Sequence, residues 1–294
     1  MDFEELFPDN REDGPTRIRQ CQLVMLRMLK ILDFLCAKHD IKYFLSGGTM
    51  LGAVRHNGFI PWDDDLDVGM TRSNFEKFQQ YAVPELPHDI FFQTDETDPG
   101  YPSFHIMEAK LRDKYSSYSK IKKWHNGLQI DIIVYDRAYL PGNTFIYLLN
   151  RALKFGLPGR KNRDRAEVLK WIEKHSIVPL VYSCSFIHGF KMVSLGTNYL
   201  KASEIRNLIK VKFEDLDSYI PVGWHGYLSR RYGSYMKPPP PEMQKGHHAN
   251  SNYMQDKDKL REAEISDAHL PDPFTPCDHK EILHWNERKL KNTI

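Results

Sequence analysis

The chain reads YFLSGGTMLGAVRHNGFIPWDDDLDV from Tyr43 to Val68, and this stretch contains the strongest pattern in the sequence. Near its end, Leu66–Met70 alternates as a β-strand does. Residues two apart on a strand point to one face, so we expect Asp65 and Asp67 side by side. Two carboxylates this close repel each other unless a hard divalent ion such as Mg²⁺ lies between them. The triplet alone is more typical of a solvated acidic turn after Pro61.

A pair of glycines, Gly47-Gly48, precedes this acidic segment. It follows a β-rich run at Ile41–Ser46 and precedes a predicted helix at Thr49–His56, for which Thr49 is a candidate N-cap. Paired glycines let the backbone approach an anion closely, and the N–H groups at a helix N-terminus favour phosphate. Gly-Gly alone is more typical of an ordinary tight turn. Its spacing from the aspartates is what favours a phosphate site.

A third carboxylate, Asp131, lies inside Leu128–Val134, the clearest predicted strand of the chain. A charge among apolar residues is costly unless it is paired or bound to a metal, so a salt bridge or an edge-strand position is the alternative. Three strand-borne carboxylates beside a glycine-rich phosphate loop predict metal-assisted phosphoryl transfer. We expect Asp63 and Asp64 to surround these carboxylates without binding the metal themselves, or to carry solvated charge.

Several basic and aromatic residues are candidate substrate contacts, each with an ordinary alternative. Arg55 and His56 could reach phosphate or lie on a helix surface. Lys110 and Arg112 are two apart in a predicted strand and so share a face, where they could contact donor phosphates or be solvated. Trp62 could stack on a base or pack beneath the loop.

The composition excludes several other classes of protein. The 294 residues are 41% hydrophobic and 27% charged, close to a soluble globular average. A net charge of +2 gives the chain no strong electrostatic attraction to nucleic acid. The four cysteines show no CxxC spacing and are typical of reduced thiols. The acidic N-terminus is unlike a secretory signal, and no apolar stretch is long enough to span a membrane. We therefore expect a cytoplasmic protein, with contact at the inner face of the membrane left open.

The order of predicted elements indicates an α+β or α/β N-terminal half followed by a helical second half. The remaining expected elements are helices at 16–39, Arg72–Tyr81, Asn143–Phe155, Arg163–His175 and Val178–Gly196, and strands at His105–Arg112 and Val211–Asp215. The basic stretch Arg151–Arg165 could meet an anionic lipid-linked glycan, although solvated surface charge is more typical.

Two stretches of the chain resemble signatures of the LicD family. The first is the quoted segment from Tyr43 to Val68. The second is RRYGSYMKPPP at Arg230–Pro240, which is similar to the family's Tyr-Gly-x-Tyr motif followed by prolines. His247-His248 matches a histidine often found after that motif. The resemblance covers about residues 20–250.

The resemblance implies an α+β fold similar to the DNA polymerase β-type nucleotidyltransferases, a mixed sheet with flanking helices. It implies a catalytic core at 1–140, a helical region at 141–250 that completes the active site, and a polar tail at 251–294. The family's metal-binding and catalytic carboxylates fall on Asp65, Asp67 and Asp131. The implied substrate-binding residues are Gly47, Gly48, Thr49, Arg55, His56, Trp62, Lys110, Arg112, Tyr232 and His247.

The family moves phosphocholine or an alditol phosphate from a CDP-activated donor to a glycan. The resemblance therefore implies a phosphotransferase dependent on Mg²⁺ or Mn²⁺, with CDP-choline or CDP-ribitol as donor. The acceptor would be a glycan or lipid-linked glycan of a cell-surface polysaccharide, lipopolysaccharide or teichoic acid, and no nucleic acid would be bound. Either Asp67 or Asp131 could deprotonate the acceptor hydroxyl.

Rival functions remain at this point. One is a nucleotidyltransferase that makes a nucleotide-activated compound, and another is a non-catalytic nucleotide-binding homologue, although no expected carboxylate is missing. A glycosyltransferase that holds a sugar nucleotide with its Asp-x-Asp pair is disfavoured by the Gly-Gly turn.

Overall fold

The structure is a computed structural model that describes residues 3–98, 101, 107–118, 125–138, 181–183, 199–246 and 252–254. The strands are β1 (Phe44–Leu45), β2 (Asp67–Thr71), β3 (Ile90–Gln93), β4 (Met107–Asp113), β5 (Ser116–Tyr118), β6 (Gln129–Ala138), β7 (Val181–Ser183), β8 (Tyr199–Lys201), β9 (Leu208–Phe213), β10 (Leu216–Pro221) and β11 (Asn252–Met254). The helices are α1 (Phe3–Leu6), α2 (Arg17–Lys38), α3 (Gly47–His56), α4 (Arg72–Lys77), α7 (Ala202–Ile205) and α8 (Trp224–Tyr232), with short turns η1 (Arg11–Asp13), η2 (Phe78–Ala82), η3 (Val83–Glu85) and η4 (Pro241–Met243).

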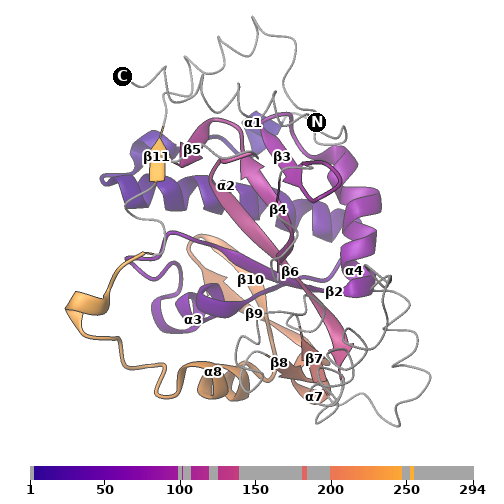
Figure 1. Ribbon diagram of the computed structural model, residues 1–294, viewed down its shortest axis with the longest axis vertical. Coiled ribbons are helices and arrows are strands. Elements are labelled where there is room, and N and C mark those ends of the chain that lie inside the picture. Colours follow the sequence, from indigo (N-terminus) through magenta and orange to yellow (C-terminus); the bar gives the residue numbers. More distant parts are fainter. Residues whose placement is uncertain are drawn as a thin grey trace, which may run out of the picture.

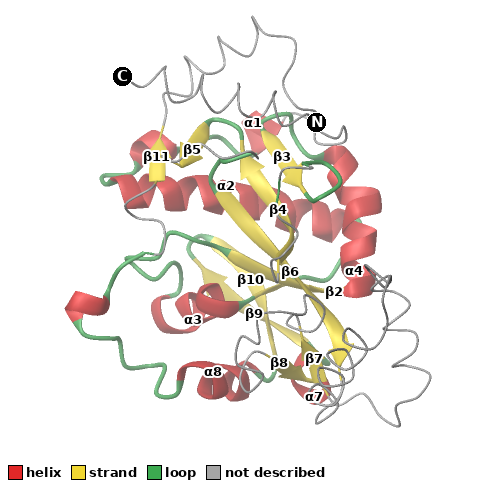
Figure 2. Ribbon diagram, in the orientation of Figure 1, coloured by secondary structure: helices red, strands yellow, loops and turns green. Residues whose placement is uncertain are grey.

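A mixed sheet organises the described part of the chain (Figure 2). Its strands follow the order β1-β2-β6-β4-β3, with β7 and β8 extending it from β6. The β2–β6 pair is parallel, whereas β1–β2, β3–β4 and β4–β6 are antiparallel. Strands β9 and β10 form a separate hairpin. Helices and a mixed sheet together make this an α+β fold, while the closer likeness to nucleotidyltransferases stays a prediction.

Helix α2 confirms the helix predicted at 16–39. Thr16 caps it by accepting the backbone N–H of Arg19, and apolar residues then recur on one face. Leu29, Leu32 and Leu35 on that face are fully buried in the core. Figure 1 shows the helix lying across the end of the sheet that contains β3 and β4. No described helix is both long and apolar enough to pass through a lipid bilayer.

Several predicted elements are confirmed with changed limits. The strand expected at Ile41–Ser46 is shorter in the structure, where it is β1. The strand expected at Val211–Asp215 corresponds to β9, which begins at Leu208 and ends at Phe213. The helix expected at Arg72–Tyr81 continues from α4 into a π-helical turn, η2. Strand β10 and helix α8 were not expected from the sequence.

The second half of the chain contains strands as well as helices in its described part, namely β7 to β10 with α7 and α8. Strand β7 falls inside the helix predicted at Val178–Gly196, so that prediction was wrong at Val181–Ser183, where the chain pairs with β6 and β8. The rest of the helices predicted between 143 and 196 lie outside the described residues, as do the basic stretch Arg151–Arg165 and nearly all of the tail at 251–294. The predicted domain limits therefore stay predictions.

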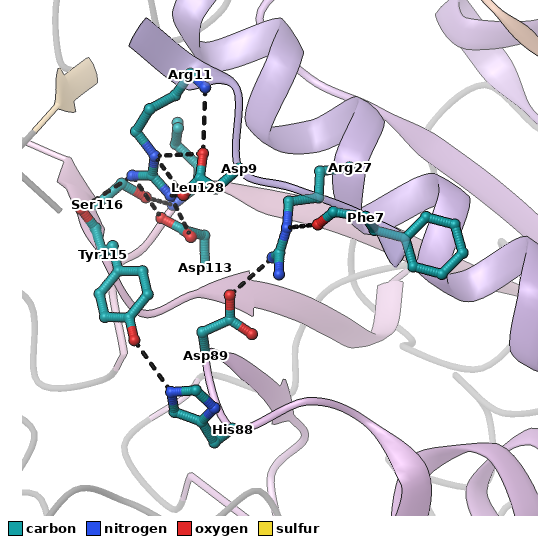
Figure 3. Close-up of polar contacts among 10 residues, drawn as sticks. All are labelled: Phe7, Asp9, Arg11, Arg27, His88, Asp89, Asp113, Tyr115, Ser116 and Leu128. Atoms are coloured by element: carbon teal, nitrogen blue, oxygen red, sulfur yellow. Dashed lines mark hydrogen bonds and ion pairs between the residues drawn. The ribbon is translucent and has the colours of Figure 1, made fainter. Parts of the chain in front are cut away.

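Buried ion pairs fasten the N-terminal segment to the sheet (Figure 3). Arg11 is only 2% exposed and lies 2.8 Å from both Asp9 and Asp113. One of its nitrogens also donates to the carbonyl of Tyr115 at 3.2 Å. Burial would lower the pKa of Arg11, but the two carboxylates outweigh burial and raise it.

A second buried pair continues this network along α2. Arg27 lies 2.8 Å from Asp89 and donates to the carbonyl of Phe7 at 2.7 Å. Burial would raise the pKa of Asp9, but the charge of Arg11 and its hydrogen bonds lower it. Every carboxylate of this network shown in Figure 3 thus faces a cation.

Candidate active site

The Gly-Gly turn begins α3 and brings that helix against two carboxylates. Gly47 has a φ of +53°, and a Cβ atom there would lie 2.7 Å from Oδ2 of Asp67. A Cβ at Gly48 would lie 3.2 Å from Oδ2 of Asp63. Only glycine combines this backbone conformation with this close approach. The helix N-terminus therefore lies directly beside the acidic segment, as the spacing of the two motifs indicated.

Two hydrogen bonds join α3 to β2 at this point. The backbone N–H of Asp67 donates to Oγ1 of Thr49 at 2.8 Å, and the backbone N–H of Ser46 donates to the carbonyl of Asp67 at 3.0 Å. Ser46 occupies the N-cap position of α3, so the expectation that Thr49 is the cap was wrong. The reason is that the helix starts at Gly47, which places Thr49 inside its first turn. Thr49 instead holds the backbone of Asp67.

The structure brings Asp65, Asp67 and Asp131 together. Asp67 and Asp131 are paired residues on the parallel strands β2 and β6, and the backbone N–H of Asp131 donates to the carbonyl of Leu66 at 2.8 Å. Asp65 lies in the loop just before β2, so the expectation that it shares a strand with Asp67 was wrong. Asp65 nevertheless lies close enough to Asp67 for its charge to raise the pKa of Asp67.

Burial and like charges dominate the electrostatics of this site. Burial raises the pKa of Asp67 well above its usual range, and the charges of Asp65 and Asp131 raise it further. Two cations, Lys110 and Arg231, act in the opposite direction. The carboxylates therefore repel one another in the absence of a bound cation.

Asp63 shares in this repulsion. Burial, then the charge and hydrogen bond of Asp65, raise the pKa of Asp63 to about 9. At neutral pH Asp63 thus keeps its proton in the metal-free protein. Asp64 is fully buried, so the expectation of solvated charge was wrong for this residue. The backbone of Gly246 packs against its carboxylate, where an added Cβ would lie 2.6 Å from Cγ.

Asp65 and Asp67 fit a divalent cation best. Oδ1 of Asp67 is buried and has no hydrogen-bond partner among the described residues. Such oxygens are the donors that Mg²⁺ and Mn²⁺ prefer. Within the described ranges, no group of three or more His, Cys, Asp or Glu side chains could hold a metal ion in the arrangement seen. Asp131 is engaged elsewhere, since its oxygens contact Nζ of Lys110 and accept from Nε2 of Gln129 at 3.2 Å.

Lys110 and Arg112 are buried on one face of β4, with exposed fractions of 6% and 3%. The solvated alternative was therefore wrong for both. Lys110 forms an ion pair with Asp131. Arg112 donates to Oε1 of Gln93 at 2.7 Å and to the carbonyl of Gly127 at 2.8 Å, which connects three segments of the sheet. A contact of either residue with donor phosphates stays a prediction.

Arg55 links the first sequence motif to the second. Its Nη1 donates to the carbonyl of Tyr235 at 2.8 Å, and Figure 1 shows the chain after α8 running beside α3. The pKa of Arg55 is lowered, because the effect of burial is larger than the opposing effect of the charge of nearby Asp63. His56 and Trp62 meet edge to face, with ring centroids 6.3 Å apart, and Trp62 packs against the core.

The second motif brings a further cation to the site. Helix α8 ends at Tyr232, where Nε of Arg231 donates to the tyrosine hydroxyl at 2.9 Å. Tyr232 is 37% exposed, and Arg231 is, with Lys110, one of the cations that act on Asp67. Arg231 was not expected at the site, although its position directly before Tyr232 in the motif was a usable signal. His247 lies outside the described residues.

Comparison with known proteins agrees with this geometry. Residues 40–147 match the family model described as LicD/FKTN/FKRP, nucleotidyltransferase domain. The chain is 28% identical over 262 residues to the lipopolysaccharide cholinephosphotransferase LicD of Haemophilus influenzae, a match that covers 81% of this chain and 98% of that protein. Residues 40–147 thus match the LicD family model, and the chain resembles a LicD protein along most of its length. The resemblance noted from the motifs is thereby confirmed.

Two shorter matches involve other proteins. The human ribitol 5-phosphate transferase FKRP is 53% identical over 30 residues, 10% of this chain and 6% of that protein. An uncharacterised protein of Rickettsia typhi is 47% identical over 58 residues, 20% of this chain and 19% of that protein.

Proposed function

We propose that this chain is a Mg²⁺- or Mn²⁺-dependent phosphotransferase. It moves phosphocholine or an alditol phosphate from a CDP-activated donor to a hydroxyl of a glycan or lipid-linked glycan. The protein would act in the cytoplasm and meet its acceptor at the inner face of the membrane. The kinship with a cholinephosphotransferase and a ribitol-phosphate transferase supports this reaction class.

The single observation that carries the proposal is the cluster of buried, mutually repelling carboxylates beside the N-terminus of α3. Asp67 has an elevated pKa and a buried oxygen that finds no hydrogen-bond partner in the described part of the chain. Such an arrangement is costly for the fold alone, and perturbed carboxylates of this kind gather at functional sites. A divalent cation on Asp65 and Asp67 would supply charge neutralisation for the donor diphosphate.

The chain's own residues account for the remaining requirements. Gly47 and Gly48 leave the start of α3 unobstructed, so that its backbone N–H groups favour a phosphate. The acceptor oxygen would form a bond to the phosphorus that bears the alcohol, and the bond from that phosphorus to the CMP oxygen would break. The proton of the acceptor hydroxyl would pass to a carboxylate. Asp131 suits this role because Lys110 and Gln129 fix its orientation.

The product separates this proposal from its rivals. Purified protein would be incubated with Mg²⁺, glycan acceptors and a panel of CDP-alcohols that includes CDP-choline and CDP-ribitol. We expect release of CMP and transfer of the alcohol phosphate. Pyrophosphate release from CTP and an alcohol phosphate would instead indicate a nucleotidyltransferase, and donor binding without turnover of the panel would indicate a non-catalytic homologue.

Variants of the two proposed ligands complete the test. We expect Asp65→Ala and Asp67→Ala to reduce CMP release by about a thousandfold or more, since metal neutralisation contributes several kcal/mol to such reactions. If both variants turned over every CDP-alcohol as the parent protein does, the proposed site would be wrong.

A further inference from the structure

The loop between α3 and β2 carries acidic residues of the proposed metal site. It begins at Asn57, the residue after α3, and ends at Leu66, directly before β2. Asp63 and Asp65 lie within it. A loop lacks the regular hydrogen bonds of a helix or strand, so contacts from other parts of the chain must fix the position of its backbone.

Gln22 of helix α2 holds the turn that leads into these acidic residues. The turn is closed by the backbone N–H of Asp63, which donates to the carbonyl of Ile60 at 2.8 Å. Nε2 of Gln22 donates to the carbonyl of Asp63 at 2.9 Å and to that of Ile60 at 3.4 Å. Only 4% of Gln22 is exposed, so this amide contact is shielded from competing water.

Arg19 fixes the direction in which this amide faces. Its Nη1 donates to Oε1 of Gln22 at 3.2 Å, so the amide nitrogen is turned to the loop carbonyls. Nη2 of Arg19 donates to Oε2 of Glu214 at 2.8 Å. One guanidinium thus connects Gln22 with Glu214, which comes from the second half of the chain.

Glu214 holds the other end of the same loop. It lies at the tip of the β9–β10 hairpin, where its Oε1 accepts from the backbone N–H of Phe59 at 3.1 Å. Its own backbone N–H donates to the carbonyl of Asn57 at 2.8 Å. A Cβ at Gly58 would lie 2.4 Å from Oε1 of Glu214, so this close approach needs glycine. The rings of Phe59 and Phe213 also pack together, with centroids 4.9 Å apart.

The backbone held in this way lies at the proposed site itself. A Cβ at Gly48 would lie 3.2 Å from Oδ2 of Asp63, and one at Gly47 would lie 2.7 Å from Oδ2 of Asp67. Both carboxylates therefore approach the start of α3, and Asp65 lies between them in the chain. Mg²⁺ accepts little deviation from octahedral geometry, so a ligand carried by a loop needs a fixed backbone.

These contacts could serve the stability of the fold alone. Their distribution favours a second role, because they hold both ends of the one loop that joins the Gly-Gly helix to the acidic strand. We propose that Gln22 is a positioning residue for the metal site, since its amide holds the backbone that leads to Asp65. Arg19 and Glu214 support this role by directing the amide. The metal itself rests on the proposed function.

The test measures Mg²⁺ binding to the full-length protein by titration calorimetry, well below the melting temperature. We expect Gln22→Met, which keeps the length of the side chain and loses the amide, to weaken binding by about tenfold. This is the lower end of the usual cost of losing a group that supports a metal ligand. Glu214→Ala lies at the hairpin tip, where the side chain is 20% exposed, and should weaken binding by about threefold, the effect of about one hydrogen bond.

Gln20→Met is the matched control. Gln20 lies on the same helix, and its Nε2 also donates to a backbone carbonyl, that of Gly14 at 3.2 Å, which belongs to the segment before α2. We expect this variant to lower the melting temperature and to bind Mg²⁺ as the parent protein does. A role in stability alone would instead leave the Mg²⁺ affinities of the two glutamine variants equal.

Unchanged Mg²⁺ binding by Gln22→Met, or an equal loss in Gln20→Met, would overturn the inference. If Gln22→Met did not fold, unchanged binding by Glu214→Ala would overturn it. Failure of the proposed function gives different results. No Mg²⁺ binding by the parent protein would remove the metal site and this inference together. Selective weakening by Gln22→Met, with no CMP released by the parent protein from any CDP-alcohol, would leave the inference standing and contradict the reaction.

Discussion

The N-terminal network and the active site bury carboxylates in opposite ways. In the network, Asp9 and Asp113 enclose Arg11 at 2.8 Å, and the pKa of Asp9 is lowered. In the active site, burial and then the charges of Asp65 and Asp131 raise the pKa of Asp67 well above the usual range. Burial is common to both regions, so the sign of the neighbouring charge is what separates them. In the first region each carboxylate is paired with an arginine, whereas the carboxylates of the second region would be stabilised by a bound cation.

The largest expected effect comes from breaking the paired region. Arg11→Met leaves two buried carboxylates without their cation, and we expect it to lower the free energy of unfolding by about 3–5 kcal/mol. Denaturant unfolding measures this change. The control is the triple change Asp9→Asn, Arg11→Met and Asp113→Asn, which removes the charges together and should recover most of the loss. Equal stability of Arg11→Met and the parent protein would contradict the structural role of the network.

A smaller effect is expected from Gly47→Ala. An alanine at a φ of +53° is strained, at a cost of about 1–3 kcal/mol, and its Cβ would meet the Asp67 carboxylate at 2.7 Å. We therefore expect both reduced stability and weaker Mg²⁺ binding. Gly233→Ala is the matched control, because Gly233 also has a positive φ but a Cβ there would meet nothing within 4 Å. It should lose stability and bind Mg²⁺ normally. Equal Mg²⁺ affinities in the two variants would count against the contact with Asp67.

The change in stability per pH unit should be smaller still, and opposite in sign for the two regions. The pKa of Asp63 is about 9 in the folded protein, against 3.8 for an ordinary aspartate. Between these values the folded protein keeps a proton that the unfolded chain releases. The metal-free protein should therefore lose stability as pH rises through this window, by at most about 1.4 kcal/mol per unit from this group. Asp9 has a lowered pKa, so its contribution is present above pH 3.8 and is lost on acidification.

Mg²⁺ should displace the proton held by Asp63, so its affinity should rise with pH, by up to about tenfold per unit between pH 6 and 8. Calorimetric titrations at these two pH values measure this, with Asp63→Asn as the control that should flatten the dependence. If the affinity of the parent protein for Mg²⁺ did not depend on pH, the proton of Asp63 would not be linked to the metal site.

Local signals in the sequence identified much of this site. The Gly-Gly pair, the Asp65 and Asp67 pair and Asp131 each stand out because turn chemistry and strand alternation are properties of short segments. The strand begins one residue later than expected, at Asp67, and Asp65 lies in the loop before it. Long-range partners had no local signal. Arg11 and Asp113 are 102 residues apart, and Arg231, whose charge acts on Asp67, also lies far from it in the sequence.

The most direct test of the account is the melting temperature of the parent protein and of Asp67→Asn, each in chelator and in Mg²⁺. If the buried carboxylates repel one another until a cation binds, the Asn variant should melt at a higher temperature than the parent protein in chelator. The reason is that a neutral amide removes the repulsion. Mg²⁺ should then stabilise the parent protein and leave the variant unchanged. A variant that melts lower in chelator and gains as much from Mg²⁺ as the parent protein would contradict the account.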